Sequence, residues 1–289
     1  MAHAPYVSTL IAPRDSEKLS PSLLNHVSEA LGAESHQWLA MGEACDVFHG
    51  HPEARAALDQ LLAMEEIDHV TQPVANRRKK LLISDMDSTM IEQECIDELA
   101  DFLGIKDQVA GITERAMNGE LDFADALRER VGLLKGLPEQ ALHSVYERQI
   151  ILMDGARALV QTMRANGAHC VLVSGGFTFF TGRVSEALGF HEDYANQLEL
   201  ADGLLTGNVI DPILGADAKL EQLNRQCAAL GITAEDVLAV GDGANDLPML
   251  LAAGMGIAYH AKPVVQAQAS ASIRHCDLSA LLYIQGYVK

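Results

Sequence analysis

The sequence predicts an α/β protein built on a Rossmann-like parallel sheet with helices on both faces. Short apolar runs at 81–83, 169–173 and 237–240 have the length and composition of buried strands. Segments with apolar residues at helical spacing separate these runs, and strands that alternate with helices are typical of a parallel sheet. For roughly sixty residues after the first run no sheet strand is apparent, which is too long for an ordinary crossover and predicts a helical insertion.

Composition limits the classes of partner. The chain has 289 residues, 48% of them hydrophobic, which suffices for one large or two modest domains. A net charge of −19 argues against nucleic acid and anionic membranes as partners. No apolar stretch approaches the ~20 residues of a membrane span, and the N-terminus does not have the pattern of a signal peptide. Five dispersed cysteines favour a reducing compartment, so we expect a cytoplasmic protein.

Residues 1–75 are expected to form a small separate α+β unit. A strand is predicted within 6–12, and a helix that Ser20 caps, Pro21 opens and Gly32 ends. Two short strands follow within 36–48, then a helix from Pro52 and a last strand within 67–74. This β-α-β-β-α-β order is the split ferredoxin-like arrangement, and it weakly resembles ACT-like regulatory domains that bind amino acids. A packing or dimerisation unit, which would make a homodimer, is the favoured alternative to a regulatory one.

The basic run 76–80 is predicted to be a solvated linker that marks the domain boundary. The core is expected at 76–91 and 150–289, and an inserted helical cap at 92–149. Cap helices are predicted over 91–103, 108–117, 123–131 and 138–148. Such an insertion covers the carboxyl edge of the sheet as a lid. In the rest of the core we expect helices at 179–188, 216–230 and 248–253, strands at 256–258 and 271–275, and a hairpin at Asp202-Gly203.

Two carboxylates follow the first buried strand, at Asp85 and Asp87. Residues two apart in extended backbone point to the same side, and ligands of open α/β sheets bind at the carboxyl ends of the strands. Adjacent anions repel each other unless a cation or a shared proton intervenes, and Mg²⁺ prefers oxygen ligands of this kind. The structural alternative is a turn or helix cap, to which Ser88 and Thr89 would also belong.

Three later segments favour a functional site over a turn or helix cap. They are Ser174-Gly175-Gly176 after the second strand, Lys219 at a helix start, and Gly241-Asp242-Gly243-Ala244-Asn245-Asp246 after the third strand. Taken singly they would be a tight turn, a solvated lysine and a loop. Their chemistry nevertheless suits a phosphate ester, because serine, backbone amides before a helix, lysine and asparagine all donate to phosphoryl oxygens. In order and type, the four segments resemble the motifs of the haloacid dehalogenase superfamily of phosphohydrolases.

The resemblance implies a mechanism and a metal. In that superfamily the first aspartate attacks phosphorus, and the second protonates the leaving group and then activates water. Carried over, Asp85 is the nucleophile and Asp87 the general acid and base. Asp85, Asp242 and the backbone carbonyl of Asp87 would hold Mg²⁺, and Asp246 would support these ligands from behind. Lys219, Ser174, Gly175 and Asn245 would bind the phosphoryl group.

The insertion carries a second resemblance, to phosphoserine phosphatases, at Glu94, at 113–118 with Met117, at Phe123 and at Arg130. A zwitterionic substrate needs a carboxylate for its ammonium group and an arginine for its carboxylate. The family pattern gives these roles to Glu94 and Arg130, and an apolar wall to Met117 and Phe123. Without it, Arg130 would be a surface charge and the two apolar residues part of the lid core.

The implied activity is hydrolysis of O-phospho-L-serine to L-serine and phosphate, the last step of serine biosynthesis. Three alternatives stay open at this point. In the first, the phosphoryl group passes to an acceptor other than water. In the second, the substrate is another small phosphomonoester such as a sugar phosphate. In a different class, the chain would be a non-catalytic amino-acid sensor on the same scaffold, although every expected catalytic position is intact.

Overall fold

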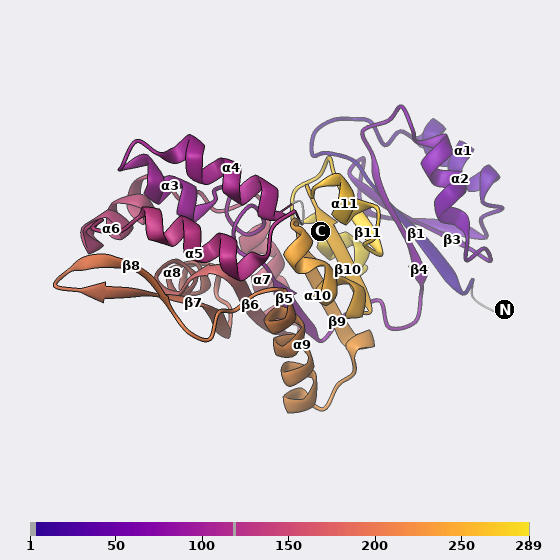
Figure 1. Ribbon diagram of the computed structural model, residues 1–289. Coiled ribbons are helices and arrows are strands. Elements are labelled where there is room, and N and C mark those ends of the chain that lie inside the picture. The colour runs from indigo at the N-terminus through magenta and orange to yellow at the C-terminus, as the bar shows by residue number, and fades with distance from the viewer. Residues whose placement is uncertain (1–3, 118–119, 289) are drawn as a thin grey trace.

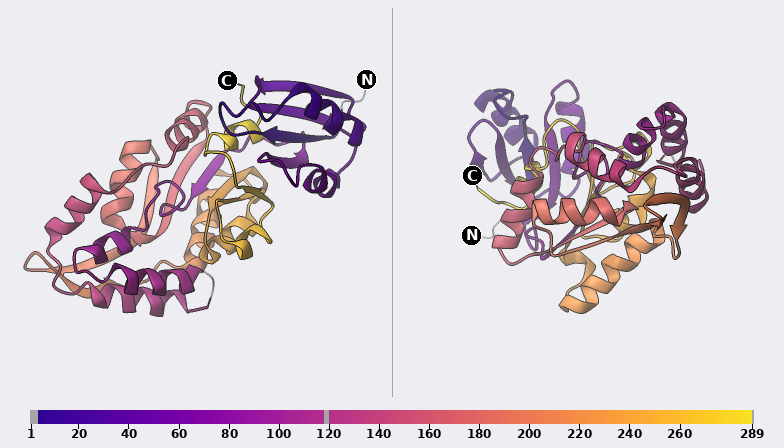
Figure 2. Two further views of the ribbon diagram at one scale, coloured as in Figure 1. Left: turned by 90° about the horizontal axis from the view of Figure 1, so that it is seen from above. Right: turned by 90° about the vertical axis from the view of Figure 1, so that its left-hand side faces the viewer.

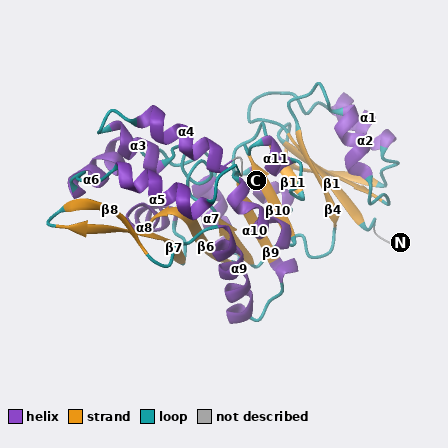
Figure 3. Ribbon diagram, viewed as in Figure 1, coloured by secondary structure: helices purple, strands orange, loops and turns teal. Residues whose placement is uncertain are grey.

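The structure, a computed structural model, describes residues 4–117 and 120–288. It contains a seven-stranded sheet and a separate four-stranded sheet. In the ribbon diagrams the four-stranded sheet and the inserted helices lie at opposite ends of the molecule, with the larger sheet between them (Figure 1, Figure 2). Helices flank the larger sheet (Figure 3).

The larger sheet has the order β11-β10-β9-β5-β6-β7-β8. All neighbouring strands run parallel except β7 and β8, which form an antiparallel edge hairpin. The predicted α/β class is confirmed, and the turn of the hairpin lies at Asp202 and Gly203, both with positive φ. The strands are β5 (Leu81–Ser84), β6 (His169–Phe177), β7 (Glu192–Ala201), β8 (Leu204–Ile210), β9 (Val237–Gly241), β10 (Met255–Tyr259) and β11 (Ala271–Ile273).

Helices bury both faces of this sheet, as the apolar composition of its strands requires. On β5, Leu82 belongs to one apolar cluster, whereas Leu81 and Ile83 belong to the cluster on the opposite face. The core helices are α7 (Ala156–Ala165), α8 (Thr178–Leu188), α9 (Ala216–Leu230), α10 (Leu247–Ala252), α11 (Pro263–Gln266) and α12 (Ala280–Ile284), with short 3₁₀ turns η1 (Ala234–Asp236) and η2 (Ala244–Asp246).

Four helices lie between β5 and β6 in the chain: α3 (Cys95–Asp101), α4 (Lys106–Met117), α5 (Phe123–Leu133) and α6 (Glu139–Arg148). The first begins later than the predicted 91–103, since Ile91 forms a bridge with Leu152. The carboxylate of Asp87 accepts a 2.8 Å hydrogen bond from the amide of Cys95 and so satisfies the start of α3. The segment after α5 is tied to the edge hairpin, because Gly136 N–H donates to Leu205.

The N-terminal unit has the predicted β-α-β-β-α-β order. It consists of β1 (Tyr6–Ile11), α1 (Pro21–Ala30), β2 (Ser35–Ala40), β3 (Ala44–His49), α2 (Ala54–Leu61) and β4 (Asp68–Pro73), with the antiparallel sheet order β2-β3-β1-β4. Ser20 caps α1 by accepting from the amide of Leu23, as its position predicts. The limits of the N-terminal unit, core and cap given above stay predictions.

The basic run 76–80 is not the solvated linker that its composition suggests. Arg77 forms a bidentate pair with the buried carboxylate of Asp46, at 2.6 and 3.0 Å, and also donates to Tyr283 and Ile284 carbonyls. Asp68, also buried, accepts from three consecutive amides at 274–276. The run is therefore partly buried, because polar groups dock the N-terminal unit onto the C-terminal segment.

No helix among the described residues is long and apolar enough to cross a membrane.

Replacing Arg77 by alanine should lower the free energy of unfolding by about 3–5 kcal/mol, because it leaves the Asp46 carboxylate buried without its cation. Urea titration measures the change. Arg78→Ala is the matched control, since this exposed neighbour makes one long hydrogen bond and stacks on Tyr287, and should cost less than about 1 kcal/mol. Equal losses in the two variants would contradict the assigned role of the pair.

Candidate active site

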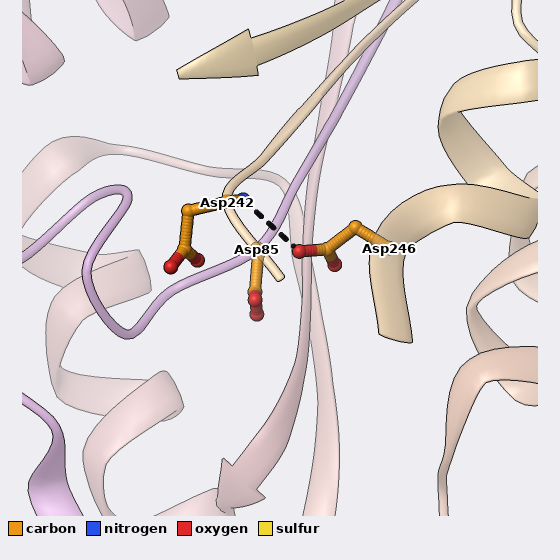
Figure 4. Close-up of side chains that lie close together, drawn as sticks. All are labelled: Asp85, Asp242 and Asp246. Atoms are coloured by element: carbon orange, nitrogen blue, oxygen red, sulfur yellow. Dashed lines mark hydrogen bonds between the residues drawn. The ribbon is translucent and has the colours of Figure 1, made fainter. Parts of the chain in front are cut away.

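Strands far apart in the chain bring three aspartates together at one edge of the sheet. Asp85 follows β5, Asp242 follows β9, and Asp246 ends η2, so the adjacency of β5 and β9 sets their separation. The backbone amide of Asp85 donates to Val240 at 3.0 Å, which continues the strand pairing up to the site. One carboxylate oxygen of each aspartate lies within 4.8 Å of the others, and all three residues are buried (Figure 4).

A single buried lysine serves this cluster. Lys219, in the first turn of α9, places its Nζ 2.9 Å from Asp85 Oδ1 and 2.5 Å from Asp246 Oδ1. The other oxygen of Asp246 accepts from the amides of Asp242 and Gly243, at 3.1 and 3.0 Å. Because both its oxygens are occupied, Asp246 is placed to hold Lys219 and the 241–243 turn, which fits a supporting position better than a metal-ligating one.

Electrostatics in the cluster favour an additional cation. Burial raises the pKa of Asp85 to about 7, with a further increase from Asp246 and an opposing effect of Lys219. Burial, Asp246 and Asp85 also raise the pKa of Asp242. Three carboxylates against one ammonium group leave an excess of negative charge in a medium of low dielectric constant. A divalent cation would remove this excess.

The oxygens left over define where such a cation fits. Asp85 Oδ1 meets Lys219 and the amide of Met86, and Asp242 Oδ1 accepts from Thr89 at 3.3 Å. Within the described part of the chain, no hydrogen bond reaches Oδ2 of Asp85, Oδ2 of Asp242 or the backbone carbonyl of Asp87. These are hard oxygen donors of the type that Mg²⁺ takes, and they belong to the same three residues that the sequence indicates.

Asp87 lies between the insertion and the carboxyl-terminal part of β6. The predicted strand 169–173 continues through Ser174, Gly175 and Gly176 to Phe177, with an irregular register against β7 after Val173, so this segment is not the turn that the sequence indicates. Its Oδ1 accepts from Cys95 at 2.8 Å, and its Oδ2 accepts from the Ser174 hydroxyl at 3.1 Å. The Ser174 oxygen in turn accepts from the amide of Gly176. A Cβ on Gly176 would lie 2.7 Å from Asp87 Oδ2, so this close approach explains the glycine at this position.

A cavity of about 60 Å³ joins this acidic edge to the inserted helices. Its walls come from both sides: Asp85, Asp87, Ser174, Gly175 and Asn245 from the core, and Glu94, Thr113, Phe123 and Arg130 from the insertion or its start. Phe123 closes one wall, since a Cβ on Gly175 would lie 2.6 Å from its ring. The predicted lid thus lies against the carboxyl edge of the sheet.

Two charged residues of the insertion side face this cavity. Glu94 accepts a 2.7 Å hydrogen bond from Ser88. Burial raises the pKa of the Glu94 carboxyl well above its ordinary value, and the negative charges of Asp87 and Asp242 raise it further. Arg130 is only 6% exposed, which rules out the surface charge considered from the sequence. The cavity therefore offers an anionic group and a cationic group beside the aspartate cluster.

The structure brings together all the predicted site residues whose side chains it describes. Met117 is the last residue of α4, and its side chain lies outside the described part of the structure. Lys219 contacts Asp85 but is fully buried, so its contact with a phosphoryl group stays a prediction.

Two residues that support the walls of the cavity are not indicated by the sequence patterns. The Asn196 side chain donates to the Gly175 carbonyl at 2.8 Å, and the Asp97 carboxylate accepts from the Thr113 hydroxyl at 2.9 Å. The position of Asp97 in the sequence could have indicated it, because it is an acidic residue one helical turn after Glu94 and lies among the apolar residues of α3.

A parallel α/β sheet with aspartates at the ends of adjacent strands, a Ser-Gly-Gly segment near the end of a neighbouring strand and a buried lysine is typical of hydrolases that handle phosphoryl groups. The particular family follows from comparison with known proteins. The model of the haloacid dehalogenase-like hydrolases matches residues 82–251, and the chain belongs to this family.

Individual relatives agree with this assignment. A protein of Polaromonas sp. named phosphoserine phosphatase is 47% identical over 208 residues, which cover 70% of this chain and 88% of the relative. The crystal structure of a HAD-family hydrolase from Salmonella enterica matches with a TM-score of 0.85 at 31% identity, over 97% of this chain and 98% of the other. A probable phosphoserine phosphatase from Vibrio cholerae matches with a TM-score of 0.78 at 34% identity, over 98% and 87%.

The raised pKa values of Asp85 and Asp242 predict how pH affects the metal-free protein. Between about pH 4 and pH 7 the folded state binds more protons than the unfolded chain, so the free energy of unfolding falls as pH rises. Asparagine at position 242 carries no such proton. In EDTA, the melting temperature of Asp242→Asn relative to the original protein should therefore increase by roughly 3 °C or more between about pH 5 and pH 8.

Differential scanning calorimetry of the two proteins side by side provides this comparison, because ionisable groups away from the cluster contribute equally to both. Loss of the Asp242 charge also lowers the pKa of Asp85, which changes the melting temperature in the same direction as the expected effect. A temperature difference that stays constant across the pH range would contradict the assigned electrostatics.

Proposed function

We propose that this chain is a phosphoserine phosphatase, which hydrolyses O-phospho-L-serine to L-serine and inorganic phosphate in the last step of serine biosynthesis. The observation that carries the proposal is the composition of the cavity: Glu94 and Arg130 line it together with Asp85, Asp87 and Ser174. An ammonium group, a carboxylate and a phosphoryl group thus each have a complementary partner. The small cavity suits a compact ligand, and the Polaromonas relative is named for this activity.

In the first step of the proposed mechanism, a carboxylate oxygen of Asp85 attacks phosphorus in line with the ester bond. The phosphorus–oxygen bond to serine breaks as Asp87 gives its proton to the departing hydroxyl oxygen. The phosphoryl group is then bonded to Asp85. Asp87, hydrogen-bonded to Ser174 and to the start of α3, is positioned between the two reacting sides.

In the second step, Asp87 takes a proton from water, and the water oxygen attacks phosphorus. The bond between phosphorus and Asp85 breaks, which restores the carboxylate and releases phosphate. Lys219 stabilises the carboxylate of Asp85 in both steps, and the Ser174 hydroxyl, the amide of Gly175 and Asn245 are assigned to the phosphoryl oxygens.

We assign Mg²⁺ as the cofactor, held by Asp85, Asp242 and the carbonyl of Asp87. When bound, it would neutralise phosphoryl charge and hold the phosphoryl group near Asp85. The support is the chemistry of the free oxygens and the excess of carboxylates over cations in the cluster.

We further propose a cytoplasmic enzyme, because all five cysteines are buried free thiols, which suits a reducing compartment. A homodimer through the N-terminal unit stays a proposal that measurement of molar mass in solution tests. Transfer of the phosphoryl group to a second alcohol is distinguished from hydrolysis by product analysis, since only hydrolysis releases phosphate in proportion to serine.

Replacement of each catalytic aspartate should give a different result. Asp85→Asn should lower the rate of phosphoserine hydrolysis at least about 10⁴-fold, because the nucleophile is lost. Asp87→Asn should lower it about 10²–10⁴-fold and leave phosphate bound to protein after acid quench of a reaction with ³²P-labelled substrate. Undiminished turnover in Asp85→Asn would disprove the nucleophile assignment.

Removal of divalent cations should abolish phosphate release, and Mg²⁺ should restore it. Mg²⁺ at saturation should also raise the melting temperature of the protein, since it binds the folded state only. Asp242→Asn should lose most of this stabilisation, because a proposed ligand is gone. Arg183→Ala is the control, since Arg183 packs on Phe179 away from the cluster. This variant should keep the full rise in melting temperature with Mg²⁺, and an equal rise in both variants would contradict the assigned ligands.

A further inference from the structure

Arg130 is held by a chain of hydrogen bonds across three helices of the insertion. Its Nη1 donates to the Thr113 hydroxyl at 3.0 Å. The single hydrogen of that hydroxyl has two acceptors within reach, Asp97 Oδ1 at 2.9 Å and the Val109 carbonyl at 3.1 Å, and we assign it to the shorter contact with the carboxylate. The Nε of Arg130 donates to the carbonyl of Ala126, one turn back in α5, at 3.1 Å. Asp97, Thr113 and Arg130 lie on α3, α4 and α5 and are 8%, 3% and 6% exposed. The guanidinium plane is therefore fixed from two sides.

The contact with Asp97 is indirect, and this has a chemical consequence. None of the ion pairs among the described residues involves Arg130. A carboxylate bonded directly to the guanidinium would occupy its paired N–H groups and compete with a carboxylate of the ligand. The threonine hydroxyl accepts one N–H and passes the polarisation on to Asp97. Three of the five N–H groups of Arg130 thereby keep no partner within the described residues, and Arg130 and Thr113 both line the cavity.

We propose that Thr113 and Asp97 are positioning residues that set substrate specificity, by aiming Arg130 at the carboxylate of phosphoserine while leaving Nη2 and the second N–H of Nη1 open to it. The proposal rests on the proposed function, because only a substrate with a carboxylate needs Arg130. It assigns no part in the chemical step to Thr113 or Asp97, which therefore affect binding of the carboxylate and not transfer of the phosphoryl group.

The test compares a substrate that carries the carboxylate with one that does not. Thr113→Val keeps the shape of the side chain and removes the hydroxyl. It should raise KM for phosphoserine about tenfold or more with kcat changed less than about threefold, and leave kcat/KM for p-nitrophenyl phosphate within about threefold. Thr113→Ser should restore the KM for phosphoserine, and Arg130→Ala marks the largest loss to expect. Asp97→Asn, which keeps an acceptor oxygen, should fall between the original protein and Thr113→Val.

Thr181→Val is the matched control. Thr181 is a buried threonine whose hydroxyl donates to Asp193 at 2.7 Å, and neither residue lines the cavity. It should change the kinetics of neither substrate, even if it lowers the melting temperature as much as Thr113→Val does.

The outcomes separate two kinds of failure. If the original protein shows no preference for phosphoserine over p-nitrophenyl phosphate, the proposed function is wrong, and the role of Thr113 falls with it. If the preference exists but Thr113→Val weakens use of both substrates equally, or leaves both unchanged, the function stands and the positioning role is overturned. Failure of Thr113→Ser to restore KM in a variant that keeps its melting temperature would likewise overturn it.

Discussion

The site depends on one buried ammonium group. Lys219 is fully buried and touches Asp85 and Asp246, and without it three carboxylates would share a volume from which water is largely excluded. An unpaired buried charge costs several kcal/mol, so the position of α9 relative to β5 and β9 is constrained by this contact as much as by apolar packing. Asp246 then fixes the 241–243 turn through two backbone amides, which places Asp242 opposite Asp85.

The insertion supplies the second wall of the cavity at this edge of the sheet. Because Asp87 bonds to both Ser174 and the first amide of α3, the two halves of the cavity meet at the proposed acid and base. The glycines at 175 and 176 allow this approach, since a side chain at either position would collide with Phe123 or Asp87. The residues proposed to recognise the ligand, on the insertion, thus contact the residues proposed to bind its phosphoryl group, on the core.

Sequence patterns were sufficient where chemistry and local structure coincide. Asp85 and Asp242 each follow an apolar strand, and Ser174 lies near the carboxyl end of β6, so the carboxyl-edge rule for parallel sheets predicts that they lie close together. The β-α-β-β-α-β order of the N-terminal unit was likewise readable from cap and breaker residues. The patterns failed where a partner lies far away in the chain: the basic run 76–80 looks solvated until Asp46 is placed beside Arg77. The start of α3 was misplaced because its cap is supplied by Asp87, seven residues before the N-cap position, and local capping rules do not reach that far.

The apolar contact between the N-terminal unit and the core has a thermodynamic meaning. Ile11, Leu39, Ala44 and Val70 from the small sheet belong to the same buried cluster as Leu82 and Ile284 of the larger unit. Two units that share one buried apolar cluster are expected to unfold together, since separating them exposes apolar surface on both. A molecule that binds at the acidic edge therefore protects the first seventy residues from unfolding as well, through population of the native ensemble and without any change of shape.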